Sequence, residues 1–506
     1  MKLHILIGGK AGQGINKVSE IVSEILVSQG YFIFNYRDYP SLVRGGHNFN
    51  ILGVSDKRIG SIESVLDIII CLDDKTLNIH KKQLKKDGIV ISYEGFENLG
   101  RNLNIALAGC LIKILGIDKE ILIKQIKKEF DNIETINSAE KGYQSQEKKF
   151  DLKKLNNKIQ IMSGSTAVAK GAVNSGINLY LAYPMTPATG VMNELAKNQI
   201  KNNLMVFQPE NEIAVVNAGL GASFSGAKVM VGTSGGGFDL MTEGLSLQGI
   251  SEIPLVVYLA SRPGPGTGVP TYSTQADLNI ALKAGHGEFP RIVIAPGDPI
   301  EAIEKTNEAF YLSEKFNALS IILSDKHLAE SEFSSDRKPN KIIPGNINRK
   351  IPGKEIVKAS SYEHDEFGNT TESPEITKKN AELRLENYEK IKKETEKFEM
   401  IKIFGNKKSK NLIIGWGSTK TVILDAIEEL DCKFLQVLYL KPMSNKIKKE
   451  LENSNKVILV EQNLTGQLGR LIREKTGIKI ENRILKYDSC PFNSDKLKKE
   501  IEERLK

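Results

Sequence analysis

Residues 179–187 read LYLAYPMTP, a short apolar run that stops where two prolines frame a threonine. The same arrangement returns three times, as an apolar run long enough for one strand followed by a polar or glycine-rich segment. These later segments are QPENE at 208–212, TSGGG at 233–237 and SRPGPGTG at 261–268. Open sheets of parallel strands bind ligands beyond the carboxyl ends of the strands. Four such segments in succession therefore predict a single crevice.

This pattern occupies the middle of three stretches in which β-branched apolar runs alternate with helical periodicity. Strands that alternate with helices imply mainly parallel sheets, so the predicted fold class is α/β, with several doubly wound domains. We expect these parts along the chain: an α/β domain at 1–142, a polar linker at 143–158, the doubly wound domain at 159–328, a connector with a charged helix at 329–409 and a C-terminal α/β domain at 410–506.

Composition excludes several classes of protein. Of the 506 residues, 40% are hydrophobic and 26% charged, which is typical of a globular chain. We find no apolar run of 18 residues, so no membrane span is expected, and the apolar run at 3–7 stops at glycines as a first strand does. The four scattered cysteines predict a reducing, cytoplasmic location and no metal site or cluster held within the chain. The net charge is +8, but the sequence contains no motif for recognition of nucleic acid. The lysines are therefore expected to lie on solvated surfaces and not in a nucleic-acid site.

The segment GGKAGQG at 8–14 lies between the first expected strand and the first expected helix. Glycines there permit a tight turn and bring backbone N–H groups to an anion at the helix N-terminus. No Gly-Lys-Ser/Thr ends the segment, and the glycines follow GxxGxG without a ribose-binding acid, so neither a Walker A loop nor a strict dinucleotide fingerprint is present. A turn required only for packing explains the same glycines, and both interpretations stay open. The candidate phosphate contacts are Gly8, Gly9, Lys10, Gly12, Gly14 and Arg44.

Two side chains of the crevice segments are candidates for chemistry. Thr186 presents a hydroxyl from a backbone that the flanking prolines restrict. Glu210 places a carboxylate where a strand ends and a helix at 213–224 begins. A carboxylate there could also serve only to complement the helix dipole, and the spacing leaves both roles open.

The order YPMTP, QPENEIAVVNAGLGAS, TSGGGFDLM and SRPGPGTG resembles the α subunit of 2-oxoacid:ferredoxin oxidoreductases, thiamine-diphosphate enzymes that decarboxylate 2-oxoacids and transfer the acyl group to coenzyme A. The segment GGKAGQGI at 8–15 resembles the start of the family's γ domain, here fused at the N-terminus. The segments YEHDEFG at 362–368 and EQNLTGQL at 461–468 are similar to the family's connector and C-terminal domain. The resemblance covers nearly the whole chain and suggests the 2-oxoglutarate branch. It implies a γ-type domain, a pyrimidine-binding-type domain and a transketolase-C-like domain.

The resemblance implies roles for residues already singled out. Glu210 matches the acid that binds the aminopyrimidine ring of thiamine diphosphate and favours the tautomer that generates the ylid. Thr186 and Arg262 match residues of the substrate pocket, where the guanidinium would pair with the oxoacid carboxylate. Tyr183 and Pro184 would border the cofactor, while the glycine segment, Lys10 and Arg44 would contact coenzyme A by analogy.

The sequence lacks parts that such an enzyme needs. It contains no Gly-Asp-Gly loop for magnesium and diphosphate, and no cysteine cluster for electron export. The resemblance implies that Mg²⁺ and a 4Fe-4S cluster lie on a separate β subunit, which shares the thiamine diphosphate and passes electrons to ferredoxin. Two alternatives remain: a non-catalytic homologue that binds coenzyme A or a nucleotide, and a nicotinamide dehydrogenase, which the absent ribose acid disfavours.

Overall fold

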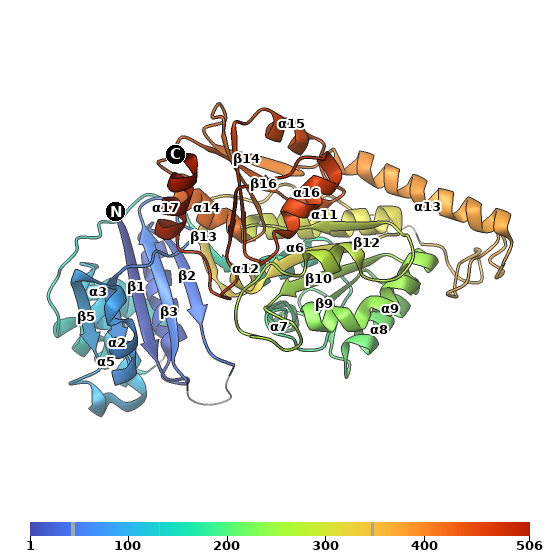
Figure 1. Ribbon diagram of the computed structural model, residues 1–506. Coiled ribbons are helices and arrows are strands. Elements are labelled where there is room, and N and C mark those ends of the chain that lie inside the picture. Colours follow the sequence, from blue (N-terminus) through green and yellow to red (C-terminus); the bar gives the residue numbers. More distant parts are fainter. Residues whose placement is uncertain (42–45, 131, 346–348) are drawn as a thin grey trace. The chain divides into compact units, whose positions relative to one another are not determined.

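The computed structural model describes residues 1–41, 46–130, 132–345 and 349–506 (Figure 1). The chain forms two compact units. Unit 1 comprises residues 1–162, 331–337 and 492–499, and unit 2 comprises residues 163–330, 338–491 and 500–506. The linker predicted at 143–158 therefore falls inside unit 1, and the predicted C-terminal domain contributes residues to both units.

Unit 1 is built on a sheet of order β5-β4-β1-β3-β2-β13-β6. The strands are β1 (Lys2–Gly9), β2 (Phe32–Asp38), β3 (Asn48–Ser55), β4 (Leu66–Cys71), β5 (Leu84–Ser92), β6 (Gln160–Ser163) and β13 (Glu332–Ser335). The helices are α1 (Ile15–Ser28), α2 (Asp74–His80), α3 (Leu103–Ile114), α4 (Lys119–Glu129) and α5 (Ile133–Gln144), with 3₁₀ turns at Lys81–Gln83 and Glu97–Asn102.

The sheet of unit 1 is mixed, and the expectation of a mainly parallel sheet was wrong for this part of the chain. β1 pairs in parallel with β4, and β4 with β5, but β3 runs antiparallel to both β1 and β2. The sequence analysis missed β3. It also missed β13, which reaches β2 from 300 residues further along the chain.

Unit 2 contains a sheet of order β17-β11-β12-β10-β9-β7-β8, parallel except for β17 against β11. Its strands are β7 (Leu179–Ala182), β8 (Met205–Phe207), β9 (Val229–Thr233), β10 (Leu255–Ser261), β11 (Arg291–Ile294), β12 (Leu319–Asp325) and β17 (Tyr439–Lys441). Its helices are α6 (Gly164–Asn174), α7 (Thr189–Lys197), α8 (Glu212–Phe224), α9 (Gly235–Ser251), α10 (Leu278–Lys283), α11 (Pro299–Phe316) and α12 (Lys326–Glu330). This is the doubly wound arrangement that the sequence predicts.

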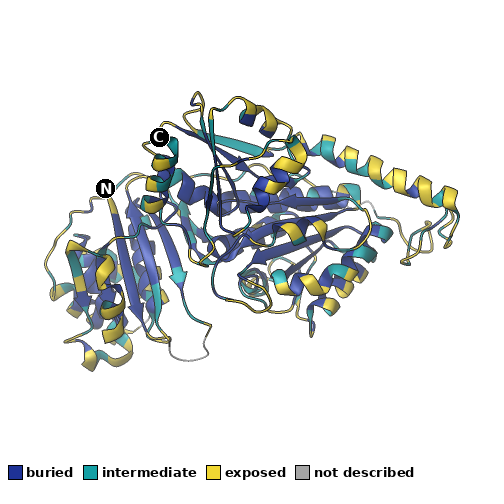
Figure 2. Cartoon of the chain, in the orientation of Figure 1, coloured by how far each residue is buried: buried dark blue, intermediate teal, exposed yellow. Residues whose placement is uncertain are grey.

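Both faces of this sheet are buried, which explains why its strands are continuous apolar runs. Val257 and Leu259 of β10 pack in one core with α8, α9 and α10, whereas the alternate residue Tyr258 points to the other face. Helix α11 packs against α6 and contacts β10, β11 and β12. The buried strands appear dark blue in Figure 2.

The remainder of unit 2 carries a third sheet of order β14-β16-β15-β18-β19. Its strands are β14 (Ile401–Gly405), β15 (Asn411–Trp416), β16 (Lys433–Val437), β18 (Lys456–Glu461) and β19 (Arg483–Leu485), and its helices are α14 (Thr419–Ile427), α15 (Lys446–Glu452) and α16 (Gln467–Thr476). The charged helix expected in the connector is α13 (Pro374–Thr395), most of whose surface is exposed (Figure 2). Helix α17 (Ser494–Leu505) ends the chain. No helix in the described ranges is long and apolar enough to cross a membrane.

One edge of the seven-stranded sheet in unit 2 carries exposed apolar side chains. β8 pairs with β7 and is the last strand of the sheet order among the described residues. Met205 and Phe207 on this strand are 61% and 53% exposed. A short edge strand with large exposed apolar side chains is a surface at which another chain can pair or pack.

Candidate active site

The four sequence segments singled out above meet at one end of the sheet in unit 2. They follow β7, β8, β9 and β10, which lie side by side in the sheet. These four strands are parallel to one another, so their carboxyl ends lie at the same edge. The structure therefore brings together the residues from which the sequence predicts a crevice.

The three glycines that begin α9 lie where the four segments meet. We call this meeting place the crevice and the glycines its floor. A Cβ on Gly235 would lie 2.6 Å from Asp277 Oδ2, and a Cβ on Gly237 would collide with Thr233 Oγ1 and Glu212 Oε1. Gly236 instead faces Gly266 and Met185, since a Cβ there would lie 3.7 Å from the Gly266 carbonyl. Side chains that follow several strand ends thus approach the same turn of α9, and at Gly235 and Gly237 a side chain would block that approach.

Arg262 extends from the end of β10 towards the proline-framed segment. Its Nη1 donates a hydrogen bond to the carbonyl of Thr186, at 3.1 Å. Partial burial lowers the pKa of the Arg262 guanidinium below its ordinary value, while the charges of Asp277 and Glu212 oppose that shift. The structure therefore brings Arg262 to the backbone of Thr186 and adds two acids to their surroundings.

Two glutamates lie at the start of α8, and they differ sharply in burial. Glu210 is exposed, whereas Glu212 is the first residue of the helix and only 4% exposed. The helix cap is Asn211, whose side chain accepts a hydrogen bond from the Ala214 N–H at 2.9 Å. Capping of α8 therefore does not explain Glu210, and Glu212 is the carboxylate that lies against the glycine floor.

Asp277 is a further acid of the crevice that the sequence analysis did not single out. It precedes α10, and its Oδ2 is buried without a hydrogen-bond partner in the described structure. Burial raises the pKa of Asp277 to about 6, against the opposing effects of the Ser261 hydroxyl and the Arg262 charge. Ser234 Oγ is likewise buried without a hydrogen-bond partner among the described residues. Buried oxygens that lack a hydrogen-bond partner can form hydrogen bonds with a polar ligand.

Tyr183 and Pro184 lie at the rim of the crevice. Both side chains are exposed, Tyr183 to 38%, and both follow the end of β7 directly.

The glycine segment of unit 1 divides into two parts. Gly8 and Gly9 end β1 and pack closely, since a Cβ on either would lie 2.6 Å from a Thr76 or Gln13 side-chain atom. Gly12 (φ 90°) and Gly14 (φ 81°) adopt the left-handed conformation that favours glycine, and Gly14 caps α1.

Gly12 and Gly14 line a pocket of about 440 Å³. The N-terminus of α1 and Arg37 border it too, although Arg37 pairs with Glu332 at 2.7 Å. Lys10 is exposed, and its backbone N–H donates to Gln13 Oε1 at 2.6 Å. Arg44 lies outside the described residues. Gly12 and Gly14 are therefore the members of the predicted phosphate site that meet in a pocket.

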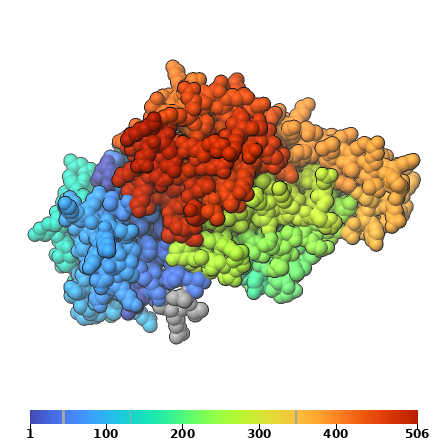
Figure 3. Space-filling view, in the orientation of Figure 1, coloured from blue at the N-terminus to red at the C-terminus, as the bar shows by residue number. Residues whose placement is uncertain are grey.

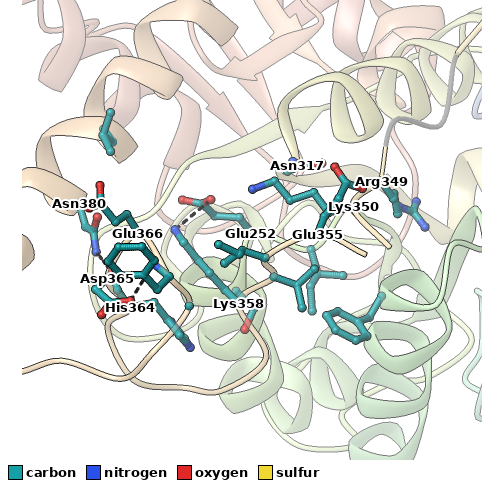
Figure 4. A pocket seen from close by; sticks show the side chains of 18 of the residues that line it. Glu252, Asn317, Arg349, Lys350, Glu355, Lys358, His364, Asp365, Glu366 and Asn380 are labelled. Carbon is teal, nitrogen blue, oxygen red and sulfur yellow. Dashed lines mark hydrogen bonds and ion pairs between the residues drawn. The ribbon is translucent and has the colours of Figure 1, made fainter. Parts of the chain in front are cut away.

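A cavity of about 780 Å³ in unit 2 lies at the other end of the sheet (Figure 4). Pro254 and Asn317, which line it, lie one and two residues before the amino ends of β10 and β12, respectively. Glu252 and Lys358 point towards one another across it, at 3.1 Å. His364 of the connector segment YEHDEFG hydrogen-bonds through Nε2 to Ser360 Oγ at 3.1 Å. This cavity is thus separate from the crevice.

Within the described ranges, no group of three or more His, Cys, Asp or Glu side chains is arranged to hold a metal ion. Cys71, Cys110 and Cys432 are buried, and Cys490 is exposed.

The doubly wound domain, with glycines, a buried carboxylate and a cation at its strand ends, is of the class that the resemblance implies, a pyrimidine-binding-type domain of thiamine-diphosphate enzymes. Consistent with that class, the model for the thiamine diphosphate-binding domain of pyruvate flavodoxin/ferredoxin oxidoreductase matches residues 170–400, and the pyruvate ferredoxin/flavodoxin oxidoreductase model matches residues 4–102. The chain belongs to the family of 2-oxoacid:ferredoxin oxidoreductase α subunits and is an oxidoreductase subunit. The predicted family and α/β fold class are confirmed.

Individual relatives support this assignment along the whole chain. A Sulfolobus 2-oxoacid:ferredoxin oxidoreductase subunit alpha is 30% identical, over 100% of this chain and 96% of its own length. A 2-oxoglutarate synthase subunit KorA from Methanocaldococcus jannaschii is 32% identical over 62% of this chain and 90% of its own. The structure of a 2-oxoglutarate:ferredoxin oxidoreductase from Magnetococcus marinus, with 2-oxoglutarate, coenzyme A and succinyl-CoA bound, superposes with a TM-score of 0.89 at 25% identity, covering 100% of both chains.

Proposed function

We propose that this chain is the fused γα subunit of an enzyme that oxidatively decarboxylates a 2-oxoacid, with 2-oxoglutarate as the first candidate, to acyl-coenzyme A and CO₂. The observation that carries the proposal is the crevice of unit 2, where Glu212, Arg262 and the three glycines at 235–237 meet at the strand ends. A homologue that only binds coenzyme A would not need this arrangement. The similarity to KorA subunits supports 2-oxoglutarate in particular.

The residues of the crevice fit the aminopyrimidine part of thiamine diphosphate. Gly236 has no atom closer than 3.7 Å to the place of a Cβ, so a ring could lie over it, and the buried Glu212 carboxylate lies against the neighbouring Gly237. Thiamine diphosphate, when bound, supplies the nucleophilic carbon and the electron sink that decarboxylation of a 2-oxoacid requires. In this proposal a glutamate carboxylate holds a proton on the ring nitrogen of the pyrimidine. The resemblance assigns that contact to Glu210, and the burial of Glu212 favours Glu212 for the same role.

Arg262 and Thr186 are proposed to bind the substrate. The Arg262 Nη1 bond to the Thr186 carbonyl fixes the guanidinium and leaves its other N–H groups available for a carboxylate. Tyr183 and Pro184 would close the exposed rim of the site.

Coenzyme A is proposed to bind at unit 1. The pocket lined by Gly12 and Gly14 at the N-terminus of α1 offers unpaired backbone N–H groups to a phosphate, which the helix dipole favours. Lys10 and Arg44 stay candidates for additional phosphate contacts, and Gly8 and Gly9 for shaping the turn.

A β subunit is proposed to complete the enzyme. It would carry the Gly-Asp-Gly loop for Mg²⁺ and the diphosphate, together with clustered cysteines for a 4Fe-4S cluster, and pass electrons to ferredoxin. Support comes from this sequence, which contains neither motif, and from the exposed apolar edge strand β8 beside the crevice. We place the complex in the cytoplasm because the four cysteines are scattered along the sequence, which suits a reducing compartment.

The test is co-expression with the adjacent reading frame that encodes a Gly-Asp-Gly loop and clustered cysteines. The purified complex should reduce ferredoxin only when thiamine diphosphate, coenzyme A and a 2-oxoacid are all present, with 2-oxoglutarate preferred over pyruvate. This chain purified alone should be colourless and inactive. An iron–sulfur spectrum from the chain alone, or a complex without activity towards a panel of 2-oxoacids, would contradict the proposal.

A further inference from the structure

A second pocket of unit 2 is lined by basic side chains and lies far from the crevice. It has a volume of about 340 Å³, and we call it the lysine pocket. It is lined by Tyr388 and Lys392 of α13, residues 442–445 after β17, Lys448 of α15, and Lys475 and Thr476 at the end of α16. Figure 1 shows the ends of α13 and α16 near α15, and Figure 3 shows the surface of α13, in orange, adjoining that of the residues beyond 430.

The position of the lysine pocket separates it from the catalytic crevice. The pocket adjoins β17, which forms one edge of the seven-stranded sheet, whereas the crevice lies at β10, β9, β7 and β8 towards the opposite edge. Two strands lie between β17 and β10, which at the usual strand spacing places them roughly 14 Å apart. A ligand of the lysine pocket would therefore be a separate molecule from the substrate at the glycine floor.

A further cation, Lys441, lies behind the pocket. It ends β17, and its Nζ lies 5.9 Å from the centre of the Tyr388 ring. In the described structure its ammonium group has no ion pair or side-chain hydrogen bond. Lys441 pairs across the sheet with Val293, two residues from Arg291, so that the two cations lie on the same face. Burial lowers the pKa of Lys441 to about 8, with further lowering by Arg291 and Lys475 and opposition from Glu474.

The acids near the pocket do not neutralise it. Lys392 approaches Glu389 at 3.4 Å, Lys475 approaches Glu474 at 2.9 Å, and Lys448 approaches Glu452 only at 3.9 Å. Each acid is an exposed neighbour on the same helix as its lysine or beside it in sequence. Exposed pairs of this kind contribute about 0–1 kcal/mol, so the lysines can turn to a ligand at little cost.

We propose that the lysine pocket binds a small phosphate monoester, with the phosphate held by Lys392, Lys448 and Lys475 and the organic part lying against Tyr388. Lysines bind phosphate as mobile point charges, and an anion there relieves the repulsion among Lys441, Lys475 and Arg291. The volume of about 340 Å³ is near the lower end for small-molecule sites, which favours a molecule no larger than a mononucleotide.

The test uses adenosine 5′-monophosphate as the ligand and the full-length chain in complex with its partner subunit. Equilibrium dialysis should show saturable binding that is at least tenfold weaker in the double variant Lys448→Gln/Lys475→Gln. The control Lys449→Gln, which removes an exposed charge from the same helix α15 outside the pocket, should change the affinity less than twofold. Inorganic phosphate should compete and adenosine should not. Absence of saturable binding at 10 mM, or equal binding in the double variant and the control, would overturn the proposal.

A second measurement needs no substitution. Acetic anhydride labels neutral lysines, and the labelling of Lys441 and Lys475 at pH 8 is followed by mass spectrometry of peptides. Adenosine 5′-monophosphate should slow the labelling of both residues at least fivefold, because an anion raises the pKa of the nearby ammonium groups and covers them. Lys449 should label at the same rate with and without the ligand. Unchanged labelling of Lys441 and Lys475, or equal protection by adenosine, would overturn the assignment of the pocket to a phosphate.

Discussion

Replacing Glu212 by glutamine in the reconstituted complex should nearly abolish turnover. The side chain is 4% exposed and lies against Gly237, so the amide fills the same space and the fold is retained. A neutral amide cannot stabilise a protonated ring nitrogen as a carboxylate does. Loss of a general acid–base contribution lowers kcat by about 10²–10⁴-fold, which corresponds to about 3–5 kcal/mol in activation free energy. By contrast, the loss of one charge at the start of α8 should cost about 0.3–1 kcal/mol of stability.

Glu210→Gln is the matched control, two residues away on the same segment. Glu210 is exposed, and Asn211 rather than Glu210 caps α8. Removal of an exposed charge is worth about 1 kcal/mol or less, so kcat should fall by about fivefold at most.

The assay is oxoacid-dependent reduction of ferredoxin or a viologen dye at saturating oxoacid, coenzyme A and thiamine diphosphate, with thermal unfolding of each variant as the check on folding. If Glu210→Gln is inactive and Glu212→Gln is not, the contact belongs to Glu210, as the resemblance implies. If both variants turn over at nearly the wild-type rate, the reasoning about a carboxylate on the pyrimidine fails.

The other predictions concern the glycine floor of the crevice, the buried acid Asp277 and the glycine segment of unit 1. Gly237→Ala should lower kcat at least tenfold, because its Cβ would displace the Glu212 carboxylate. The control is Gly221→Ala on α8, where no atom lies within 4 Å of the added Cβ. This control should raise the free energy of unfolding by about 0.5–1 kcal/mol in denaturant titrations. The pKa of Asp277 is raised from 3.8 to about 6, so the folded chain binds the extra proton between about pH 4 and 6 and loses stability as pH rises through that window. The free energy of unfolding of Asp277→Asn should therefore exceed that of the wild type by up to about 3 kcal/mol at pH 7.5 and equal it near pH 4. A difference between the two proteins that does not change with pH would contradict this prediction. Lys10→Glu should raise the KM for coenzyme A severalfold and leave the KM for the oxoacid unchanged, and equal KM values for coenzyme A would remove Lys10 from the phosphate site.

The crevice could be predicted from the sequence because its parts are local. Each strand is a short apolar run, and each is followed within two residues by proline, glycine or a charged residue, so the strand ends are marked one by one. Since parallel strands bring their carboxyl ends to one edge, the order of these segments was enough to place them together.

The choice between two glutamates was harder because it depends on where one helix begins. The segment QPENE offers carboxylates two residues apart, and helix starts inferred from periodicity carry an error of that size. Asn is among the preferred N-cap residues, which is the signal that could have placed Asn211 outside the helix and Glu212 within its first turn.

Other features depend on contacts between distant residues and have no local signal. β13 joins the sheet of unit 1 from residue 332, and its partner β2 begins at residue 32. Asp277 reaches the glycine floor from a loop some 40 residues after Gly235. Because tertiary packing decides both, neither a mixed sheet nor this buried acid follows from composition or periodicity.

The exposed edge of the sheet in unit 2 has a practical consequence for handling the chain. β8 offers a row of backbone groups not paired on its outer side by any described strand, beside Met205 and Phe207. Until a partner covers this edge, copies of the chain can associate strand to strand, and the tendency grows with concentration. Refolding or overexpression of the chain alone should therefore yield oligomers and precipitate, and sedimentation of a dilution series would reveal them. Synthesis of both subunits from one transcript would limit the time for which the edge stays uncovered.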